Sequence, residues 1–439
     1  MLTACGGGAA ATSSVQDAAS TTDTAGASGG AGGAGEGGGG APGADAGATG
    51  GAGAAATAGG PFVPAPHQTL PQVINSGGPV VTAPKVLPIL YTGDTGASDV
   101  GAFLQELTRT TYWGETTSEY GVGPLTVLPT VTLSEVGPPV ISDAELQAML
   151  IESTSGANPA FGAADPSTIY MFALPSGTIE SDTQGACCTD FDGYHSETTG
   201  GPIALPYVVA CACPGVGGGA DSALHLRTIA ISHELVETAT DPFPHTTPAF
   251  LGADHDHLVW SSVTGGGELA DMCVLNEDAF FIPPGSQYMI QRSWSNAAAE
   301  ATAEPCVPTR SAGPYFNTFP ALGPVSYTVR LGRPFTTQGI KIPLGTTLTI
   351  PLNLYSSADT GADWTVRVFD ANELKNGSSN LSLSLDRATG HNGDTINLTI
   401  TPHTKDAMLG GEAFLLFSEL GTPHSGTFRS STMVGLVTN

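Results

Sequence analysis

The chain has 439 residues, enough for two ordinary domains, and carries 13 basic against 40 acidic residues for a formal net charge of -27. Nucleic acid and anionic membrane surfaces both require cationic neutralisation, so this composition excludes them as main partners. Only 12% of the residues are charged while 59 are glycine, which indicates low-complexity sequence somewhere in the chain.

That low-complexity sequence is at the start of the chain. Residues 6–60 are almost all Gly, Ala, Ser, Thr and Asp, without apolar periodicity, and predict a disordered tether. Before it, Leu2-Thr3-Ala4-Cys5 resembles the lipobox of a bacterial signal peptide, in which the cysteine is lipidated. We therefore expect residues 1–60 to be a lipobox followed by a linker. The protein would then be extracytoplasmic, either anchored to a membrane by a lipid at Cys5 or secreted.

After a Pro-rich lead-in, strand and helix patterns alternate. Ser142-Asp-Ala-Glu145 forms a capping box that opens one of the helices. We expect strands at 85–91, 125–133, 168–174 and 203–210, a loop at 187–201, and helices at 99–112, from Ser142, and from a cap at Asp221 to about Asp241, before Pro242. This order predicts an α/β or α+β domain over residues 61–310.

From residue 311 onward, apolar and polar residues alternate with period two in several short segments, as in Leu348, Ile350, Leu352 and Leu354. Turn residues separate these segments, which predicts an antiparallel, immunoglobulin-like β-sandwich over residues 311–439. It contains no cluster of chemically reactive residues, so we expect a structural or binding module.

Six cysteines remain after Cys5, and an even number in an exported protein predicts three disulfides. They are Cys187, Cys188, Cys211, Cys213, Cys273 and Cys306. The sequence does not choose among the fifteen possible pairings. A vicinal disulfide is strained, so Cys187 and Cys188 should bond to different partners. Metal thiolates are the competing interpretation, but Cys211-Ala-Cys213 lacks the usual two-residue spacing of a zinc knuckle.

The segment Ser232-His-Glu-Leu-Val-Glu237 carries the main chemical signal, an H-E-x-x-E pattern late in a helical stretch. Residues i and i+4 share one helix face, so His233 and Glu237 could bind one metal ion. Glu234 would then be the catalytic base, as in H-E-x-x-H zinc hydrolases, with the second histidine replaced by a carboxylate. In the simpler alternative, His233 is a buried histidine bonded to Glu237, and Glu234 is solvated.

A catalytic zinc usually has three protein ligands. Glu268 and Asp271 are candidates for the third, and would share a face if their segment is helical. One histidine with two carboxylates neutralises a divalent cation and weakens it as a Lewis acid, which favours a histidine instead. Of the spare histidines His195 is the best candidate, whereas His255 and His257 are typical of a surface cluster.

Together these segments resemble the plant EXORDIUM, or phosphate-induced, protein family over roughly residues 85–295. The resemblance rests on the motif helix ending in Pro242, on Glu268-Leu-Ala-Asp-Met-Cys273, and on Gly193-Tyr194-His195. It also includes the strand 85–91 and the pair Cys211 and Cys213. The family implies an extracellular, disulfide-bonded protein, without an established catalytic activity to carry over. Here Cys187 and Cys188 are adjacent, unlike in the family, and the tether and β-domain are additions.

Two functional hypotheses follow. In the first, a cell-surface lipoprotein carries a zincin-like, zinc-dependent hydrolase domain, with a peptidase favoured over an esterase. In the second, a non-catalytic surface or matrix protein holds a structural or vestigial metal, zinc or another divalent cation, and binds a peptide, a protein or a cell-envelope glycan.

Overall fold

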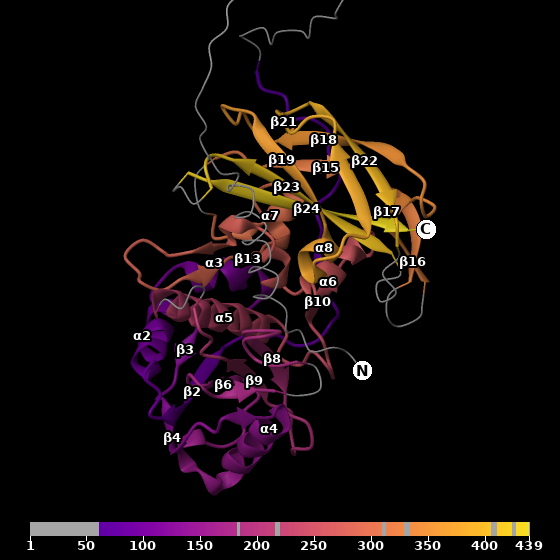
Figure 1. Cartoon of the computed structure of the whole chain (residues 1–439). Helices are drawn as coiled ribbons and strands as arrows, with labels where there is room; N and C mark the ends of the chain where they lie inside the picture. Colours follow the sequence, from indigo (N-terminus) through magenta and orange to yellow (C-terminus); the bar gives the residue numbers. More distant parts are fainter. Residues whose placement is uncertain are drawn as a thin grey trace, which may run out of the picture.

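The computed structural model describes residues 61–181, 185–215, 220–309, 313–328, 334–404, 411–423 and 427–438. The expected tether and the lipidated Cys5 lie outside these ranges, as does the side chain of the expected cap Asp221. The fold is mixed, with more strand than helix (Figure 1). None of the helices in these ranges is long and apolar enough to cross a bilayer.

The first half of the chain builds a sheet ordered β3-β2-β6-β9-β8, with β4 also paired to β2. Its strands are β2 (Lys85–Thr92), β3 (Thr126–Val127), β4 (Val131–Val136), β6 (Thr168–Ala173), β8 (Gly193–Glu197) and β9 (Pro206–Ala210). All pairs are parallel except β8 with β9. The antiparallel strand β8 therefore forms one edge of an otherwise parallel sheet.

Helices cover both faces of this sheet, which explains why β6 is buried at every position. Its odd-numbered residues Ile169 and Met171 pack in the cluster that contains α5 (Ala220–Thr240) and α2 (Ala97–Leu107). Its even-numbered residues Tyr170 and Phe172 pack in the cluster that contains α4 (Asp143–Glu152). Figure 1 shows α5 and α4 on opposite sides of the sheet.

Short elements complete this half. The helices are α3 (Tyr112–Thr117), α6 (Leu258–Thr264) and α7 (Asn296–Glu300), and single turns occur at Ser118–Tyr120, Ser153–Ala157, Pro159–Phe161, His255–His257, Asp271–Cys273 and Glu277–Ala279. The small strand pairs are β1 (Val73–Asn75) with β10 (Phe250–Ala253), β5 (Val140–Ile141) with β7 (Ile179–Glu180), β11 (Phe280–Phe281) with β12 (Ile290–Gln291), and β13 (Ser293–Trp294) with β14 (Cys306–Val307).

Two further sheets face each other in the second half. One has the order β15 (Phe316–Pro320), β18 (Leu348–Ser356), β22 (Thr395–Pro402), β20 (Leu381–Leu385). The other has the order β16 (Gly323–Thr328), β17 (Pro334–Lys341), β24 (Arg429–Thr438), β23 (Glu412–Leu420), β19 (Trp364–Asp370), β21 (Thr389–Gly390), with α8 (Ala371–Asn376) after β19. The predicted alternation is present, since Ile350, Leu352 and Leu354 of β18 are buried and point between the sheets.

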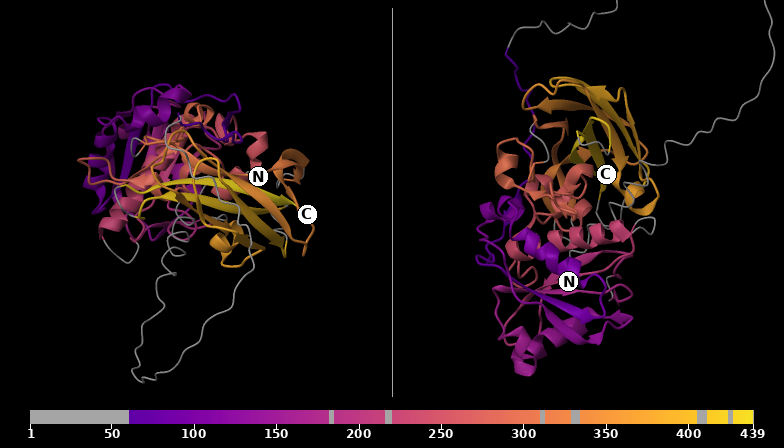
Figure 2. Two further views of the ribbon diagram at one scale, coloured as in Figure 1. Left: turned by 90° about the horizontal axis from the view of Figure 1, so that it is seen from above. Right: turned by 90° about the vertical axis from the view of Figure 1, so that its left-hand side faces the viewer.

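The sandwich lies directly against the first half (Figures 1 and 2). One continuous apolar cluster includes Ile231 of α5, Trp260 of α6 and Leu436 of β24. Hydrogen bonds cross the same contact, from Ser430 Oγ to Asp278 Oδ1 at 2.9 Å and from Thr432 Oγ1 to the Leu275 carbonyl at 3.2 Å. The division at residue 310 stays a prediction, but the two halves share a core.

Three sequence expectations need correction. The helix expected at 99–112 ends at Leu107, before a run of Thr and Arg residues, and a separate helix starts at Tyr112. Pro129, which has no N–H, interrupts the strand expected at 125–133. The segment 187–201, expected to be a loop, contains the buried edge strand β8.

The capping box at Ser142 and Glu145 is confirmed, and α5 ends at Thr240 as Pro242 predicts. All six predicted cysteines form disulfides, Cys187–Cys211, Cys188–Cys213 and Cys273–Cys306. The adjacent cysteines bond to different partners, as expected. The thiolate alternative is thereby wrong for Cys211 and Cys213.

Candidate metal centre

The last three turns of α5 are buried on every side, which places the H-E-x-x-E motif inside the molecule. Ile231 and Leu235 of this helix pack in the apolar cluster that also contains Ile169 and Met171 of β6. His233 and Glu237 lie one turn apart, and the segment that contains Glu268 and Asp271 covers them. The side chains of these four residues are at most 5% exposed.

Glu237 has one fixed oxygen and one free oxygen. Its Oε1 accepts hydrogen bonds from the backbone N–H groups of Ala270 and Asp271, both at 3.1 Å. Among the described residues its Oε2 has no hydrogen-bond donor with suitable geometry, and it lies 3.1 Å from His233 Nε2. The backbone therefore orients this carboxylate toward the histidine.

His233 is oriented in the same way. Gln291 Nε2 donates to the Ala270 carbonyl at 2.7 Å, so the amide oxygen of Gln291 faces His233 Nδ1, at 3.0 Å. This contact favours the proton on Nδ1 and leaves the lone pair on Nε2. Asp271 follows the pattern, because its Oδ2 accepts from the Gly267 N–H at 3.0 Å while Oδ1 lies 3.7 Å from His233 Nε2.

Glu234 lies beside His233, Glu237 and Asp271 and contacts β8. Its Oε2 is 3.3 Å from Nδ1 of His195, a fully buried residue on that strand. The close approach of α5 to β8 depends on Gly193, because a Cβ there would lie 2.9 Å from the Val209 carbonyl oxygen and 3.3 Å from Glu234 Cγ. A residue with a side chain at 193 would push the strand away from the motif.

A second group of polar atoms lies on the far side of His195. His195 Nε2 is 3.3 Å from Glu268 Oε1, and neither that nitrogen nor either carboxylate oxygen of Glu268 makes a hydrogen bond within the described residues. In Asp241, Oδ1 accepts a hydrogen bond from the Ala249 N–H at 2.7 Å, while Oδ2 is buried and has no partner in the part of the chain that the structure describes. His195 Nδ1 also lies 3.7 Å from Glu237 Oε2, so Glu237 links the two groups.

The charges of these groups perturb one another strongly. Burial lowers the pKa of His233, but the charges of Glu237 and Glu234 outweigh it and raise that pKa well above its usual value. The pKa of His195 is raised in the same way, with the charge of Glu268 opposing burial. Burial raises the pKa of Glu237, but the charge of His233 outweighs it, so the net shift is downward.

The remaining carboxyl groups shift upward. Burial, then the charge of Glu237, raises the pKa of Asp271 well above its usual value, and burial raises the pKa of Glu234. Burial, then the charge of Glu268, raises the pKa of Asp241 to about 7. Without a cation, the centre therefore holds protons on its histidines and on part of its carboxyl groups. A divalent cation would displace these protons.

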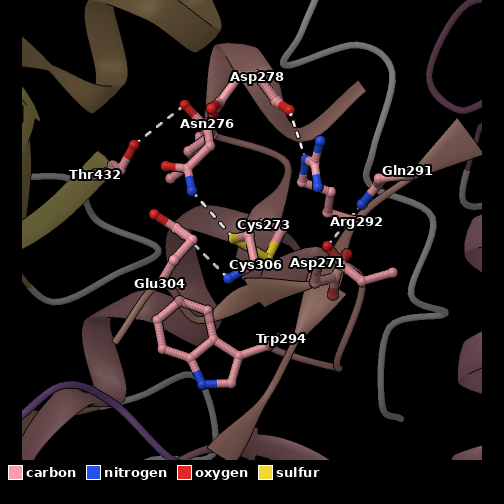
Figure 3. Close-up of a disulfide and its surroundings, with 12 residues drawn as sticks. Asp271, Cys273, Asn276, Asp278, Gln291, Arg292, Trp294, Glu304, Cys306 and Thr432 are labelled. Carbon is pink, nitrogen blue, oxygen red and sulfur yellow. Dashed lines mark hydrogen bonds between the residues drawn. A yellow bond between two sulfur atoms is a disulfide. The ribbon is translucent and has the colours of Figure 1, made fainter. Parts of the chain in front are cut away.

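A disulfide fixes the segment that covers the motif. Cys273 ends the short turn that begins at Asp271 and is bonded to Cys306 (Figure 3). Around the sulfurs, Asn276 Nδ2 donates to Cys306 Sγ at 3.1 Å and the Cys306 N–H donates to Glu304 Oε1 at 3.1 Å. Asp271 thus lies two residues from a covalent crosslink.

The structure brings together every residue that the sequence predicted for the site. Five of these residues form two groups that share Glu237. One group is His233, Glu237 and Asp271, and the other is His195, Glu237 and Glu268. Glu268 is not helical, so the expected common helix face with Asp271 is wrong; a glycine turn at 265–267 brings both carboxylates inward instead. His255 is exposed and His257 contacts Asp254, as a surface cluster would.

Sequence reasoning missed Gln291 and Asp241. The spacing of Asp241, four residues after Glu237, was a usable signal, because it continues the face of the motif. Gln291 gave none, since it stands in a two-residue strand far along the chain.

No family model matches this chain, and neither does any curated protein. Domains 4 and 5 of the S-layer protein SbsC align with 27% of this chain and 54% of their own length, at 13% identity and a TM-score of 0.16. Two longer structures of SbsC each align with 37% of this chain and 19% of theirs, also at 13% identity and a TM-score of 0.16. This chain thus spans about half, or about a fifth, of those S-layer chains, and we infer nothing about function from such TM-scores.

Proposed function

We propose that the first half of the chain is a zincin-like, zinc-dependent hydrolase domain, with a peptide bond as the favoured substrate. One observation carries the proposal. His233 Nε2, Glu237 Oε2 and Asp271 Oδ1 lie close to one another, while the second polar atom of each side chain is already bound by Gln291 or by backbone N–H groups. Such fixed outer contacts orient metal ligands and raise their basicity.

These residues fit zinc by number and by type. One imidazole and two carboxylates supply three ligands and leave a fourth position. When bound, zinc would lower the pKa of a water and polarise a carbonyl group, more weakly here because the two carboxylates neutralise its charge. Asp271 therefore replaces the histidine that charge reasoning favoured as third ligand, and His195 contacts the base instead.

Glu234 is the residue suited to take a proton from the attacking water. It is adjacent to His233 in the chain, and the contact with His195 Nδ1 fixes one of its oxygens. Burial raises its pKa, which makes it a stronger base than an exposed glutamate.

A second candidate function is a non-catalytic binding or matrix protein with a structural metal. The observation that favours it is burial, because side chains that are at most 5% exposed resemble the closed ligand shells of structural sites. Metal removal would then unfold the protein, whereas a catalytic metal would exchange without unfolding.

For the cellular setting we propose an extracytoplasmic protein, either secreted or anchored by lipid at Cys5. Three disulfides are consistent with an oxidising compartment. The resemblance to the EXORDIUM family remains part of this proposal, and a peptide, protein or cell-envelope glycan remains the proposed partner.

The test combines metal content with hydrolysis, using the full chain with its disulfides formed. His233→Ala should bind one zinc equivalent less than the wild type, and the exposed control His255→Ala should bind as much as the wild type. Glu234→Gln should keep its zinc and lose hydrolysis of a peptide library by about 10²-fold or more. Unchanged zinc in His233→Ala would overturn the metal site, and unchanged hydrolysis in Glu234→Gln would overturn the mechanism.

A further inference from the structure

We propose that the centre binds a second divalent cation, held by His195, Glu237 and Glu268, next to the zinc at His233 and coupled to it through the shared Glu237. This inference rests on the proposed function and extends it from a one-metal to a two-metal site. One imidazole with several carboxylates suits a borderline or hard divalent ion such as Zn²⁺ or Mn²⁺.

Buried polar atoms with incomplete hydrogen bonding gather around His195 and Glu268. His195 Nε2 and Glu268 Oε1 face each other as an ion pair at 3.3 Å, whereas Glu268 Oε2 and Asp241 Oδ2 have no partner within the described residues. The three residues are at most 2% exposed. Leaving such groups buried and unpaired costs several kcal/mol, so native proteins pair them or give them to a metal.

The buried charge of the centre also favours a second cation. Five buried carboxyl groups surround two histidines, namely Glu234, Glu237, Asp241, Glu268 and Asp271. Within the described part of the chain, the ion pairs that they form are all with His195 or His233, not with lysine or arginine. If all five are ionised, one divalent cation leaves three negative charges buried. Two cations leave one, which suits a single base at Glu234.

The orientation of His195 is suited to a second cation as well. Its Nδ1 faces Glu234 Oε2 at 3.3 Å and can donate a proton to it. Its Nε2 then carries the lone pair and faces Glu268 Oε1, also at 3.3 Å. His195 would thus bind the second cation with one nitrogen and position Glu234 with the other, just as His233 uses one nitrogen for Gln291.

Sharing of Glu237 sets the spacing of the two cations. Its Oε2 is 3.1 Å from His233 Nε2 and 3.7 Å from His195 Nδ1, the nitrogen that also faces Glu234, and Glu237 is a member of both candidate ligand groups. Two ions that share one carboxylate lie about 3.5–4 Å apart in two-metal hydrolases. The competing arrangement is a protonated His195 paired with Glu268, with no second cation.

The first experiment counts zinc by mass spectrometry after equilibration with Zn²⁺ and gel filtration. Wild type should hold two equivalents, and Glu268→Gln and His233→Ala one each. One equivalent in wild type that is lost in His233→Ala but kept in Glu268→Gln would overturn the second site and leave the proposed function standing. One equivalent lost in Glu268→Gln but kept in His233→Ala would place a single cation at Glu268 and overturn both the zinc at His233 and the two-metal centre. No zinc in wild type would overturn both sites.

The second experiment needs no variant and therefore does not depend on the folding of Glu268→Gln. Wild-type protein loaded with Mn²⁺ alone should give an exchange-coupled electron paramagnetic resonance signal, because two ions share Glu237. A saturating signal from isolated Mn²⁺ only, at one equivalent, would overturn the second site.

Discussion

The Cys273–Cys306 disulfide allows a quantitative test, because it closes a ring that contains the cover of the motif. The two cysteines are 33 residues apart. In the chain-entropy model, a ring of this size stabilises the folded state by about 3.7 kcal/mol at 25 °C. The double variant Cys273→Ala/Cys306→Ala should lose about that much unfolding free energy in urea.

The same variant should also bind zinc more weakly, because Asp271 and the N–H groups that fix Glu237 lie in the released segment. Cys188→Ala/Cys213→Ala is the matched control, since its ring of 25 residues predicts about 3.5 kcal/mol by the same model. A loss below about 1 kcal/mol for the first variant would refute the stability reasoning of that model. Equal zinc affinities in the two variants would refute the assignment of Asp271.

Three further predictions concern other parts of the fold. Gly193→Ala should cost about 1–3 kcal/mol in urea unfolding, because its Cβ would overlap the Val209 carbonyl, and a neutral effect would contradict the close packing of β8 on α5. Asp94→Asn breaks a buried ion pair with Arg227 at 2.9 Å and should cost about 3–5 kcal/mol; a thermal shift near zero would show that the pair is not needed. Burial, then the charge of Asp278, raises the pKa of Glu304 from 4.5 to about 8. Because the folded state holds this proton more tightly than the unfolded state, Glu304 stabilises the fold fully below pH 4.5. That contribution is lost as the pH rises toward 8. In Glu304→Gln that decline, at most about 1.4 kcal/mol per pH unit, should disappear, and an unchanged pH profile would argue against it.

Much of the fold was predictable because burial leaves a periodic trace. The apolar run at 169–174 and the alternation at Leu348, Ile350 and Leu352 each indicated their strands correctly. The strand β8 was missed, since Gly193-Tyr-His-Ser-Glu197 contains three polar residues that are buried, of which His195 contacts the site. The single helix expected at 99–112 failed for a local reason, the run of Thr and Arg residues after Leu107.

The candidate site was predictable as a set of residues but not as a geometry. Spacing placed His233 and Glu237 on one helix face, and composition indicated Glu268, Asp271 and His195. The division into two groups depends on which edge strand carries His195 and on the turn before Glu268. Both are tertiary facts, and neither leaves a signal in the spacing of the chemical residues. Gln291 depends on tertiary contact in the same way.

The fixed oxygen of Glu237 bears on why the motif ends in glutamate and not in histidine. An imidazole has two nitrogens, and a nitrogen that binds a metal leaves the other, usually protonated, with no lone pair to offer. It could not accept the N–H groups of Ala270 and Asp271, which Glu237 Oε1 accepts together. Glu237→His would restore the H-E-x-x-H ligand pattern of zinc hydrolases. It would also leave the buried N–H groups of Ala270 and Asp271 without their hydrogen-bond acceptor. Glu237 is therefore both a candidate metal ligand and the hydrogen-bond acceptor that holds the segment containing Ala270 and Asp271 over the motif. A substitution at this position would disturb the folded structure as well as the metal site.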